Sequence, residues 1–189
     1  MRSYDLPTSL TIGEVAYPIN YGWKTAIDIF CEMNDPDKTQ EERVAIMLVK
    51  LFPNWKEFRP EHISEAIQKA CDFLDCGRKP ERKVHPKLVD WEQDAEIIIP
   101  AVNQSANREI RMDPGIHWWT FFGWYMSIEG GLFATVLRIR SKKAKGKKLE
   151  KWEEEFYRDN RHLIDLKNAE TDEVRREKEN IMKWLNGGG

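Results

Sequence analysis

A chain of 189 residues can form one compact domain with a substantial core, and its charged fraction of 33% favours helices with charged outer faces over disorder throughout. The formal net charge of -2 excludes a global field that would steer the protein to nucleic acid or to an acidic membrane. No stretch approaches the roughly 20 apolar residues needed to cross a bilayer, so we expect no membrane contact. The N-terminus lacks the apolar core of a signal peptide and the cysteines form no CxxC pair, which predicts a cytoplasmic protein with three reduced thiols, Cys31, Cys71 and Cys76.

The first 52 residues predict a β-hairpin followed by two helices. β-Favouring residues flank Gly13, and a glycine at the first central position suits a tight hairpin turn. Apolar residues then recur at helical spacing in residues 23–33 and again in residues 44–51. The second helix starts with a capping box, because Thr39 is followed three places on by Glu42.

Two further helices are expected before residue 103. Residues 60–75 predict a third helix, with Gly77 as its C-terminal stop. A fourth helix is expected to begin near Pro86, and Pro100 is expected to kink it or end it early because its ring denies a hydrogen bond to the preceding turn. The apolar residues of the third helix lie at helical spacing: Ile63, Ala66, Ile67, Ala70 and Leu74.

The stretch DPGIHWWTFFGWYMSIEGG, residues 113–131, gathers large aromatic rings and a histidine within nine positions. Asp113 and Pro114 predict the N-cap and the first residue of its helix, and Gly130-Gly131 its end. This helix is apolar nearly all round, which is typical of the centre of a bundle. A partial partner surface is the alternative, and a cofactor pocket is disfavoured because nothing nearby supplies phosphate-binding glycines or a metal set. The expected core residues are Trp91, His117, Trp118, Trp119, Phe121, Phe122 and Trp124.

The chain after residue 131 predicts further helices among many charges. Apolar periodicity continues through residues 132–143 and returns in residues 149–160, whereas residues 168–189 would form only a marginal helix without packing or a partner. The whole pattern predicts a mainly α protein, a single helical bundle of about seven or eight helices with a small N-terminal β-hairpin. We expect one domain over residues 1–167 and a charged C-terminal helix, free to act as a mobile appendage, over residues 168–189.

No motif predicts a catalytic, metal or cofactor site, so we expect a binding protein and not an enzyme. Asp90 and Asp94 stand one helical turn apart, as do Glu92 and Glu96, and such carboxylates can hold a divalent cation or act as an acid and base pair. A solvated helix face explains them equally well. The histidines are scattered and supply no third ligand with the spacing of a metal motif: His62, His85, His117 and His162.

A basic run without acidic residues occupies residues 138–148, and runs of this kind can neutralise phosphates. The segment EKWEEE follows at once and would repel the same phosphates. A solvated connector or a contact with an acidic partner protein is therefore favoured, and nucleic-acid binding is disfavoured. The run comprises Arg138, Arg140, Lys142, Lys143, Lys145, Lys147 and Lys148.

Five stretches, in chain order, carry a family resemblance: LPTSLTIGEVAYPIN (6–20), DFLDCG (72–77), DWEQDAEIIIPAVNQ (90–104), DPGIHWWTFF (113–122) and RIRSKKAKGKKLEKWEEEFYRDN (138–160). Together they resemble the Gp-fifteen family of bacteriophage proteins. Members of that family are small proteins of long-tailed phages of Gram-positive bacteria, encoded in the tail module near the major tail protein and the tape measure. The paired tryptophans after His117 are the most specific part of the resemblance, which covers most of residues 6–160.

The resemblance implies a role in virion assembly, and the gene position suggests a tail-assembly chaperone in the host cytoplasm. Such a chaperone would coat the long, helical, apolar tape-measure protein and help to recruit tail-tube subunits. The family has no catalytic residues to carry over. A structural virion component such as a tail completion or connector protein, a nucleic-acid-binding regulator and a metal-dependent enzyme are the alternatives, and homo-oligomerisation is left open.

A helical protein can accept an apolar helical stripe in a groove between its own helices, and many weakly bound copies on one chain act through local concentration. The expected contact residues are those that a bundle core does not obviously need: Trp152, Phe156, Tyr157, Ile181, Trp184 and Leu185. Packing of these residues onto the bundle is the open alternative. The open edges of the N-terminal hairpin are a further expected contact.

Overall fold

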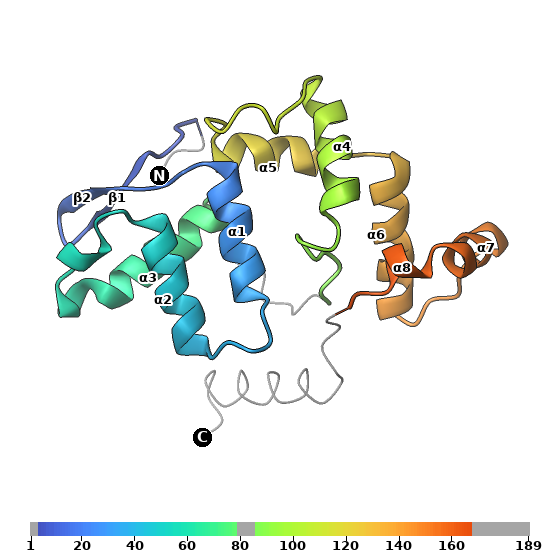
Figure 1. Ribbon diagram of the computed structural model, residues 1–189, viewed down its shortest axis with the longest axis horizontal. Coiled ribbons are helices and arrows are strands. Elements are labelled where there is room, and N and C mark those ends of the chain that lie inside the picture. Colours follow the sequence, from blue (N-terminus) through green and yellow to red (C-terminus); the bar gives the residue numbers. More distant parts are fainter. Residues whose placement is uncertain (1–3, 79–85, 168–189) are drawn as a thin grey trace.

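The computed structural model describes residues 4–78 and 86–167. Over these ranges the chain is mainly α-helical, with eight α-helices and an N-terminal β-hairpin (Figure 1). The predicted fold class is therefore confirmed.

The N-terminal hairpin pairs β1 (Ser9–Ile12) with β2 (Val15–Pro18) in antiparallel register, as predicted. Gly13 and Glu14 both take positive φ, 52° and 69°, which is the combination of a type I′ turn. The turn lies directly against the His62 ring, because a Cβ added to Gly13 would approach that ring to 2.1 Å. A glycine is thus required at this position both for the turn and for the close approach.

Helices α1 (Trp23–Met33) and α2 (Gln40–Leu51) pack against each other through their apolar faces. The predicted capping box of α2 is present. The Thr39 hydroxyl accepts a hydrogen bond from the N–H of Glu42 at 3.2 Å, and the Glu42 carboxylate accepts one from the N–H of Thr39 at 2.8 Å. The buried residues of the two helices are Trp23, Ala26, Ile29, Met47, Leu48 and Leu51.

Two short 3-10 turns, η1 (Trp55–Glu57) and η2 (Pro60–His62), lead into α3 (Ile63–Leu74). Ile63 is the first residue of α3 and is 43% exposed, so it does not join the buried face although it lies at helical spacing with Ala66 and Ala70. The buried residues of α3 are Ala66, Ala70, Phe73 and Leu74. The helix stops where predicted, with Gly77 at a φ of 69°.

The fourth helix, α4 (Ala95–Ala106), begins later than predicted, since residues 86–90 have no regular secondary structure and residues 91–94 form a turn. The Asp90 carboxylate accepts hydrogen bonds from the backbone N–H groups of Glu92 and Gln93, at 3.2 and 3.0 Å. Side chains that bond neighbouring backbone in this way compete with helix formation. The expected start near residue 86 is therefore wrong.

Pro100 lies inside α4 and does not end it, because the helix continues to Ala106. The proline removes only the bond to the carbonyl of Glu96. Glu96 and Pro100 are both exposed, so water can donate a hydrogen bond to the Glu96 carbonyl. The helix ends at Asn107, which takes a left-handed φ of 50°.

Helix α5 (Trp118–Met126) holds the aromatic block, with His117 as its N-cap in place of the predicted Asp113. Asp113 instead accepts a hydrogen bond from the N–H of Gly115 at 3.0 Å, within a turn. Gly22 and His117 then form an antiparallel bridge that keeps the backbone extended. This non-local bridge is why the helix starts at residue 118 and not at Pro114.

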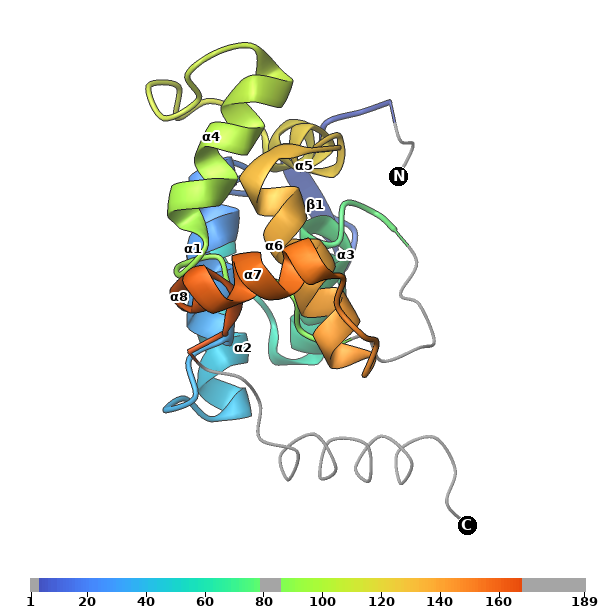
Figure 2. The ribbon, with the colours of Figure 1, turned by 90° about the vertical axis from the view of Figure 1, so that its right-hand side faces the viewer.

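Helix α6 (Gly131–Ala144) packs against α4 and leads into α7 (Lys151–Asp159) and the short α8 (Arg161–Ile164). Figure 2 shows α7 lying across α6. We call α7 and α8 the C-terminal arm. The arm rests on a second apolar cluster, separate from the main core and built on Val136, Ile139 and Ile164.

The main core lies around α1 and α5. In Figure 1 the hairpin, α2 and α3 lie on one side of α1, and α4, α6 and the C-terminal arm lie on the other. Helix α5 runs across the top between the two groups and contacts both α1 and α4. Within the described ranges, no helix is both long enough and apolar enough to cross a membrane.

Candidate functional site

The first residue of the aromatic block, His117, joins the start of α5 to the N-terminal segment. Its ring is buried, and its Nδ1 accepts a hydrogen bond from the N–H of Trp119 at 3.0 Å. Its Nε2 lies 2.9 Å from the carbonyl of Pro7, so Nε2 carries the proton and donates it to that oxygen. Burial lowers the pKa of His117, although the Pro7 carbonyl opposes this effect. The imidazole is therefore a neutral helix cap that also ties down the N-terminal segment.

The two tryptophans that follow close the end of α3. The Trp118 indole N–H donates to the carbonyl of Leu74 at 2.8 Å, and the Trp119 indole N–H donates to the carbonyl of Phe73 at 2.9 Å. Carbonyls in the last turn of a helix lack their regular helical partners. The paired indoles thus have a structural role, because each packs its ring on the main core and satisfies a carbonyl of another helix.

The rest of the aromatic block is less enclosed than predicted. Trp118 and Phe121 are fully buried, whereas the other predicted core rings are half-buried: Trp91, Trp119, Phe122 and Trp124. The Arg78 guanidinium lies 4.3 Å from the centroid of Phe122, and the Arg108 guanidinium lies 5.8 Å from that of Trp124. Helix α5 therefore has one face in the core and one face beneath cationic side chains.

Arg140 and Asp94 form a buried ion pair where α4, α6 and α8 meet. The guanidinium donates two hydrogen bonds to the carboxylate, at 2.6 and 2.8 Å, and the two side chains are only 4% and 1% exposed. Its three other N–H groups donate to the carbonyls of Leu88, Leu163 and Ile164, at 2.7, 2.6 and 2.8 Å. All five donors are satisfied, so this pair joins the C-terminal arm to α4 and offers no free group for chemistry.

Trp152 is the exposed aromatic residue of the C-terminal arm. It is 42% exposed, and its indole N–H donates to the Glu150 carboxylate at 3.0 Å. The Arg138 guanidinium lies 4.6 Å from the centroid of its ring. Such stacking holds a large apolar surface in one orientation at the surface of the protein.

Glu153 fixes the start of α7 on α6. Its carboxylate is fully covered and accepts hydrogen bonds from the N–H of Glu150 at 2.8 Å and from the ammonium of Lys142 at 2.6 Å. These contacts hold its pKa below the usual range even though burial would raise it. With Glu153 turned toward α6, its neighbour Trp152 remains accessible.

The two other arm residues predicted to contact a partner face the protein itself. Phe156 packs on the second apolar cluster. The Tyr157 hydroxyl donates to the Asp165 carboxylate at 3.0 Å, and the Lys143 ammonium lies 3.7 Å from the ring centroid. Both are half-buried, so Trp152 alone of these three is largely open to a partner. The other predicted contact residues lie outside the described residues: Ile181, Trp184 and Leu185.

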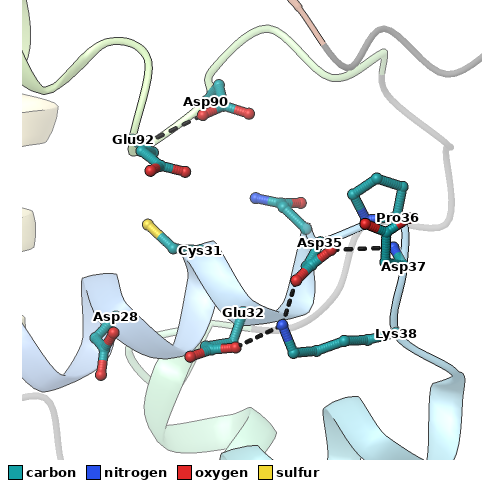
Figure 3. A pocket seen from close by; sticks show the side chains of 10 residues that line it. Asp28, Cys31, Glu32, Asp35, Pro36, Asp37, Lys38, Asp90 and Glu92 are labelled. Atoms are coloured by element: carbon teal, nitrogen blue, oxygen red, sulfur yellow. Dashed lines mark hydrogen bonds and ion pairs between the residues drawn. The ribbon is translucent and has the colours of Figure 1, made fainter.

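An acidic cleft with a volume of about 700 Å³ opens between the C-terminal end of α1 and the turn at residues 90–92 (Figure 3). In Figure 3, Cys31 points from α1 toward Glu92. The cation that lines the cleft, Lys38, is paired with Asp35 and with Glu32, the latter at 2.9 Å. The lining carboxylates are Asp28, Glu32, Asp35, Asp37, Asp90 and Glu92.

The surroundings of the three cysteines raise the pKa values of their thiols. Burial, followed by the carboxylates of Glu92 and Asp90, raises the pKa of Cys31 to about 11. Burial also raises the pKa of Cys76, to about 12, and that of Cys71. All three thiols are therefore protonated at neutral pH, whereas a nucleophilic cysteine needs a lowered pKa.

The basic run is divided among several roles. Arg140 is buried, Lys142 binds Glu153, and Lys143 binds Asp165 at 2.6 Å. Among residues 4–78 and 86–167, no ion pair is formed by the three lysines that follow α6, namely Lys145, Lys147 and Lys148. A small cleft of about 180 Å³ lies beside the first two. The sequence shows one continuous cationic stretch. In the structure only its last three lysines form an exposed cluster without internal ion pairs among the described residues.

Comparison with known proteins identifies the family. The family model described as "Bacteriophage Gp15 protein" matches residues 3–166. The chain belongs to this family. The match runs from the N-terminal hairpin through the C-terminal arm, so it includes both the buried Arg140 pair and Trp152. No curated protein and no solved structure matches the chain significantly.

The membership confirms the family resemblance seen in the sequence and makes the chain a bacteriophage protein. In this Gp15 family protein, Asp94 is engaged by Arg140, and Asp90 lies 3.0 Å from the ammonium of Lys87. The two carboxylates therefore do not form the open pair that the sequence allowed. Over the described part of the chain, no three His, Cys, Asp or Glu residues are grouped so as to hold a metal ion.

Proposed function

We propose that this Gp15 family protein is a phage tail-assembly chaperone. It binds the tape-measure protein of its phage in the host cytoplasm, assists assembly of the tail tube and catalyses no reaction. The family membership supports a role in the phage life cycle. The arrangement of the C-terminal arm supports binding to another protein.

The observation that carries the proposal is the position of Trp152. A tryptophan that is 42% exposed and braced by Arg138 presents a large apolar surface at little further cost in side-chain entropy. Tryptophan and arginine are enriched among the residues that dominate protein binding energy. The core does not need this ring, because Phe156 supplies the contact of α7 with the second apolar cluster.

The tape measure is a partner of matching chemistry. A long helix with an apolar stripe can lay that stripe against Trp152 and the outer face of α7. That face also carries Glu154, Glu155 and Asp159, all exposed. We therefore expect the bound stripe to be flanked by lysine or arginine.

The chemistry of the described residues also favours binding over catalysis. A thiol nucleophile is disfavoured, because the pKa values of Cys31 and Cys76 are raised to about 11 and about 12. An acid and base pair at Asp90 and Asp94 is disfavoured, because Arg140 occupies both oxygens of Asp94. If a double Asp90→Asn, Asp94→Asn variant gave normal tail assembly despite its lower stability, the metal-dependent alternative would be removed.

The test is co-expression with the tape-measure protein encoded by the same phage. We expect the tape measure to become soluble and to co-purify with the wild-type chain, and we expect Trp152→Ala to reduce the recovered complex about tenfold or more. Trp55→Ala is the matched control, since Trp55 is 39% exposed but lies in η1, away from the arm. Both variants should show unfolding curves close to that of the wild type.

Two results would contradict the proposal. One is a tape measure that stays equally insoluble with and without the chain. The other is a complex that Trp152→Ala and Trp55→Ala weaken equally, which would place the contact elsewhere. Recovery of the chain in purified virions would instead identify a structural component of the particle.

A further inference from the structure

We propose that two copies of this chain pair about a two-fold axis, with the cationic end of α6 of each copy seated against the acidic cleft of the other. The cationic end consists of Lys145, Lys147 and Lys148. The proposal is independent of tape-measure binding, which uses Trp152.

The cationic end is exposed at the C-terminal end of α6. Lys145 is the C-cap of the helix, and Gly146 then turns the chain so that Lys147 and Lys148 follow in an exposed loop. Earlier lysines of the same run are used internally, because Lys142 binds Glu153 and Lys143 binds Asp165. Lys145, Lys147 and Lys148 form no ion pair with a carboxylate within the described ranges.

The acidic cleft carries the opposite charge to the cationic end, because carboxylates line it. It is large enough, at about 700 Å³, to admit lysine side chains. Asp28, Glu32 and Asp35 are engaged by Lys38 or Lys50, whereas Asp37 and Glu92 are exposed and form no ion pair in the part of the chain that the structure describes. These two carboxylates are the ones left to bind cations of another molecule.

The two surfaces lie on the same side of the molecule. Helices α1 and α6 both run downward in Figures 1 and 2 and end in the lower half of the described molecule, where the acidic cleft adjoins the end of α1 and the lysines follow the end of α6. When two complementary patches share one edge, a two-fold axis brings each against its counterpart in the second copy, and the assembly closes as a dimer. Patches on opposite ends would instead generate an open chain of copies.

A second copy of the chain offers both complementary patches at once, whereas a general anionic partner would engage the lysines alone. The formal net charge of -2 gives no long-range attraction between identical molecules, so the attraction must come from opposed local patches. Such contacts are exposed and screened by salt. The predicted dimer therefore dissociates as the ionic strength rises.

The experiment measures the mass of the full-length chain by sedimentation velocity. At about 50 mM NaCl we expect a species of twice the 22.3 kDa chain mass, and at about 500 mM NaCl we expect the monomer. Lys145→Glu with Lys147→Glu, and separately Asp37→Lys with Glu92→Lys, should each raise the dimer dissociation constant at least about tenfold. None of these four side chains makes an ion pair within its own described chain, so the variants are expected to fold.

The decisive step is to mix the two reversed variants. One then carries two acidic patches and the other two basic patches, so an equimolar mixture should form a heterodimer with the affinity of the wild type. Glu57→Lys with Glu61→Lys is the matched control, because it changes the net charge as much as the cleft variant does but lies in η1 and η2. This control should leave the dimer intact.

Several outcomes would overturn the proposal. A wild-type chain that is monomeric at low salt and high concentration would do so, as would a dimer that is unaffected by either reversal. Masses that grow beyond the dimer with concentration would indicate a head-to-tail chain of copies and contradict the two-fold arrangement. A mixture of the reversed variants that stays monomeric would show that the two patches do not bind each other.

Discussion

Arg140 donates two hydrogen bonds to Asp94 inside the protein, at 2.6 and 2.8 Å, and these residues come from α6 and from the start of α4. The same guanidinium also bonds the carbonyls of Leu163 and Ile164 at the end of the C-terminal arm. One side chain therefore joins three segments that are distant in the sequence. This junction fixes the end of the arm, while the contact of Glu153 with Lys142 fixes its start beside Trp152.

Arg140→Met should destabilise the protein strongly. The variant leaves the Asp94 carboxylate buried without its partner, and breaking a buried pair in this way costs about 3–5 kcal/mol. The free energy of unfolding, measured in urea on the full chain, should fall by this amount. Arg158→Met, an exposed arginine on α7, is the control and should stay within about 0.5 kcal/mol of the wild type. A loss below about 1 kcal/mol at Arg140 would mean that the pair is not buried as described.

Thr39→Ala should remove one half of the capping box of α2. The hydroxyl of Thr39 bonds the N–H of Glu42, and loss of such a cap costs about 1 kcal/mol. Denaturant unfolding measures the change. Gln40→Ala, at the next residue, keeps the box and should leave the free energy of unfolding unchanged or slightly higher. Equal effects of the two substitutions would show that the cap contributes nothing.

The stability of the protein should fall in acid through His117. Because burial lowers the pKa of His117 in the folded state, the unfolded chain binds the proton more readily. The stabilisation is complete above the ordinary histidine pKa of about 6.5 and is lost as the pH falls through the lower value of the folded state. Protonation of Nδ1 also removes the acceptor for the N–H of Trp119.

The pH effect is measured as the slope of the unfolding free energy against pH, between about pH 7 and pH 5. His117→Asn keeps a side-chain oxygen at the N-cap but does not titrate, so its slope should be smaller than that of the wild type. Comparison of slopes removes the contribution of the carboxylates, which is common to both proteins. Identical slopes would contradict the assignment of His117 as a neutral cap.

The cysteines should react slowly with alkylating reagents in the native protein. The pKa of Cys31 is about 11 against an ordinary value of 9.0, so its thiolate fraction near neutral pH is lower by about 100-fold. Iodoacetamide labelling followed by mass spectrometry of peptides gives the rate at each cysteine. Cys76, with a pKa of about 12, should react more slowly still. Native rates equal to those in denaturant would show that the thiols are open and unperturbed.

Local signals in the sequence predicted the fold well. The capping box at Thr39 and Glu42, the hairpin turn at Gly13 and the stop at Gly77 all depend on residues within one or two turns of each other, and all three are present. The starts of α4 and α5 were predicted wrongly for a shared reason. Asp90 and Asp113 bond nearby backbone, and the chain before Trp118 is held extended by Gly22 from the entry to α1.

The candidate site was harder to predict, because its contacts are non-local. The sequence places Arg140 in a basic run and Asp94 in a carboxylate pair. No local pattern in either segment indicates that these two residues bind each other. One signal was available: Arg140 continues the helical row of Phe133 and Val136, which are buried. A cation on an apolar row requires a buried partner, and Asp94 is the acidic residue that supplies it.

The central claim is that the aromatic block belongs to the fold while the C-terminal arm contacts the partner. Hydroxyl-radical footprinting of the chain, alone and bound to the tape-measure protein, tests this claim most directly because it reports the solvent exposure of each ring. The account predicts that oxidation of Trp152 falls on binding, whereas oxidation of Trp119, Phe122 and Trp124 stays the same. Protection of the α5 rings with unchanged oxidation of Trp152 would contradict it.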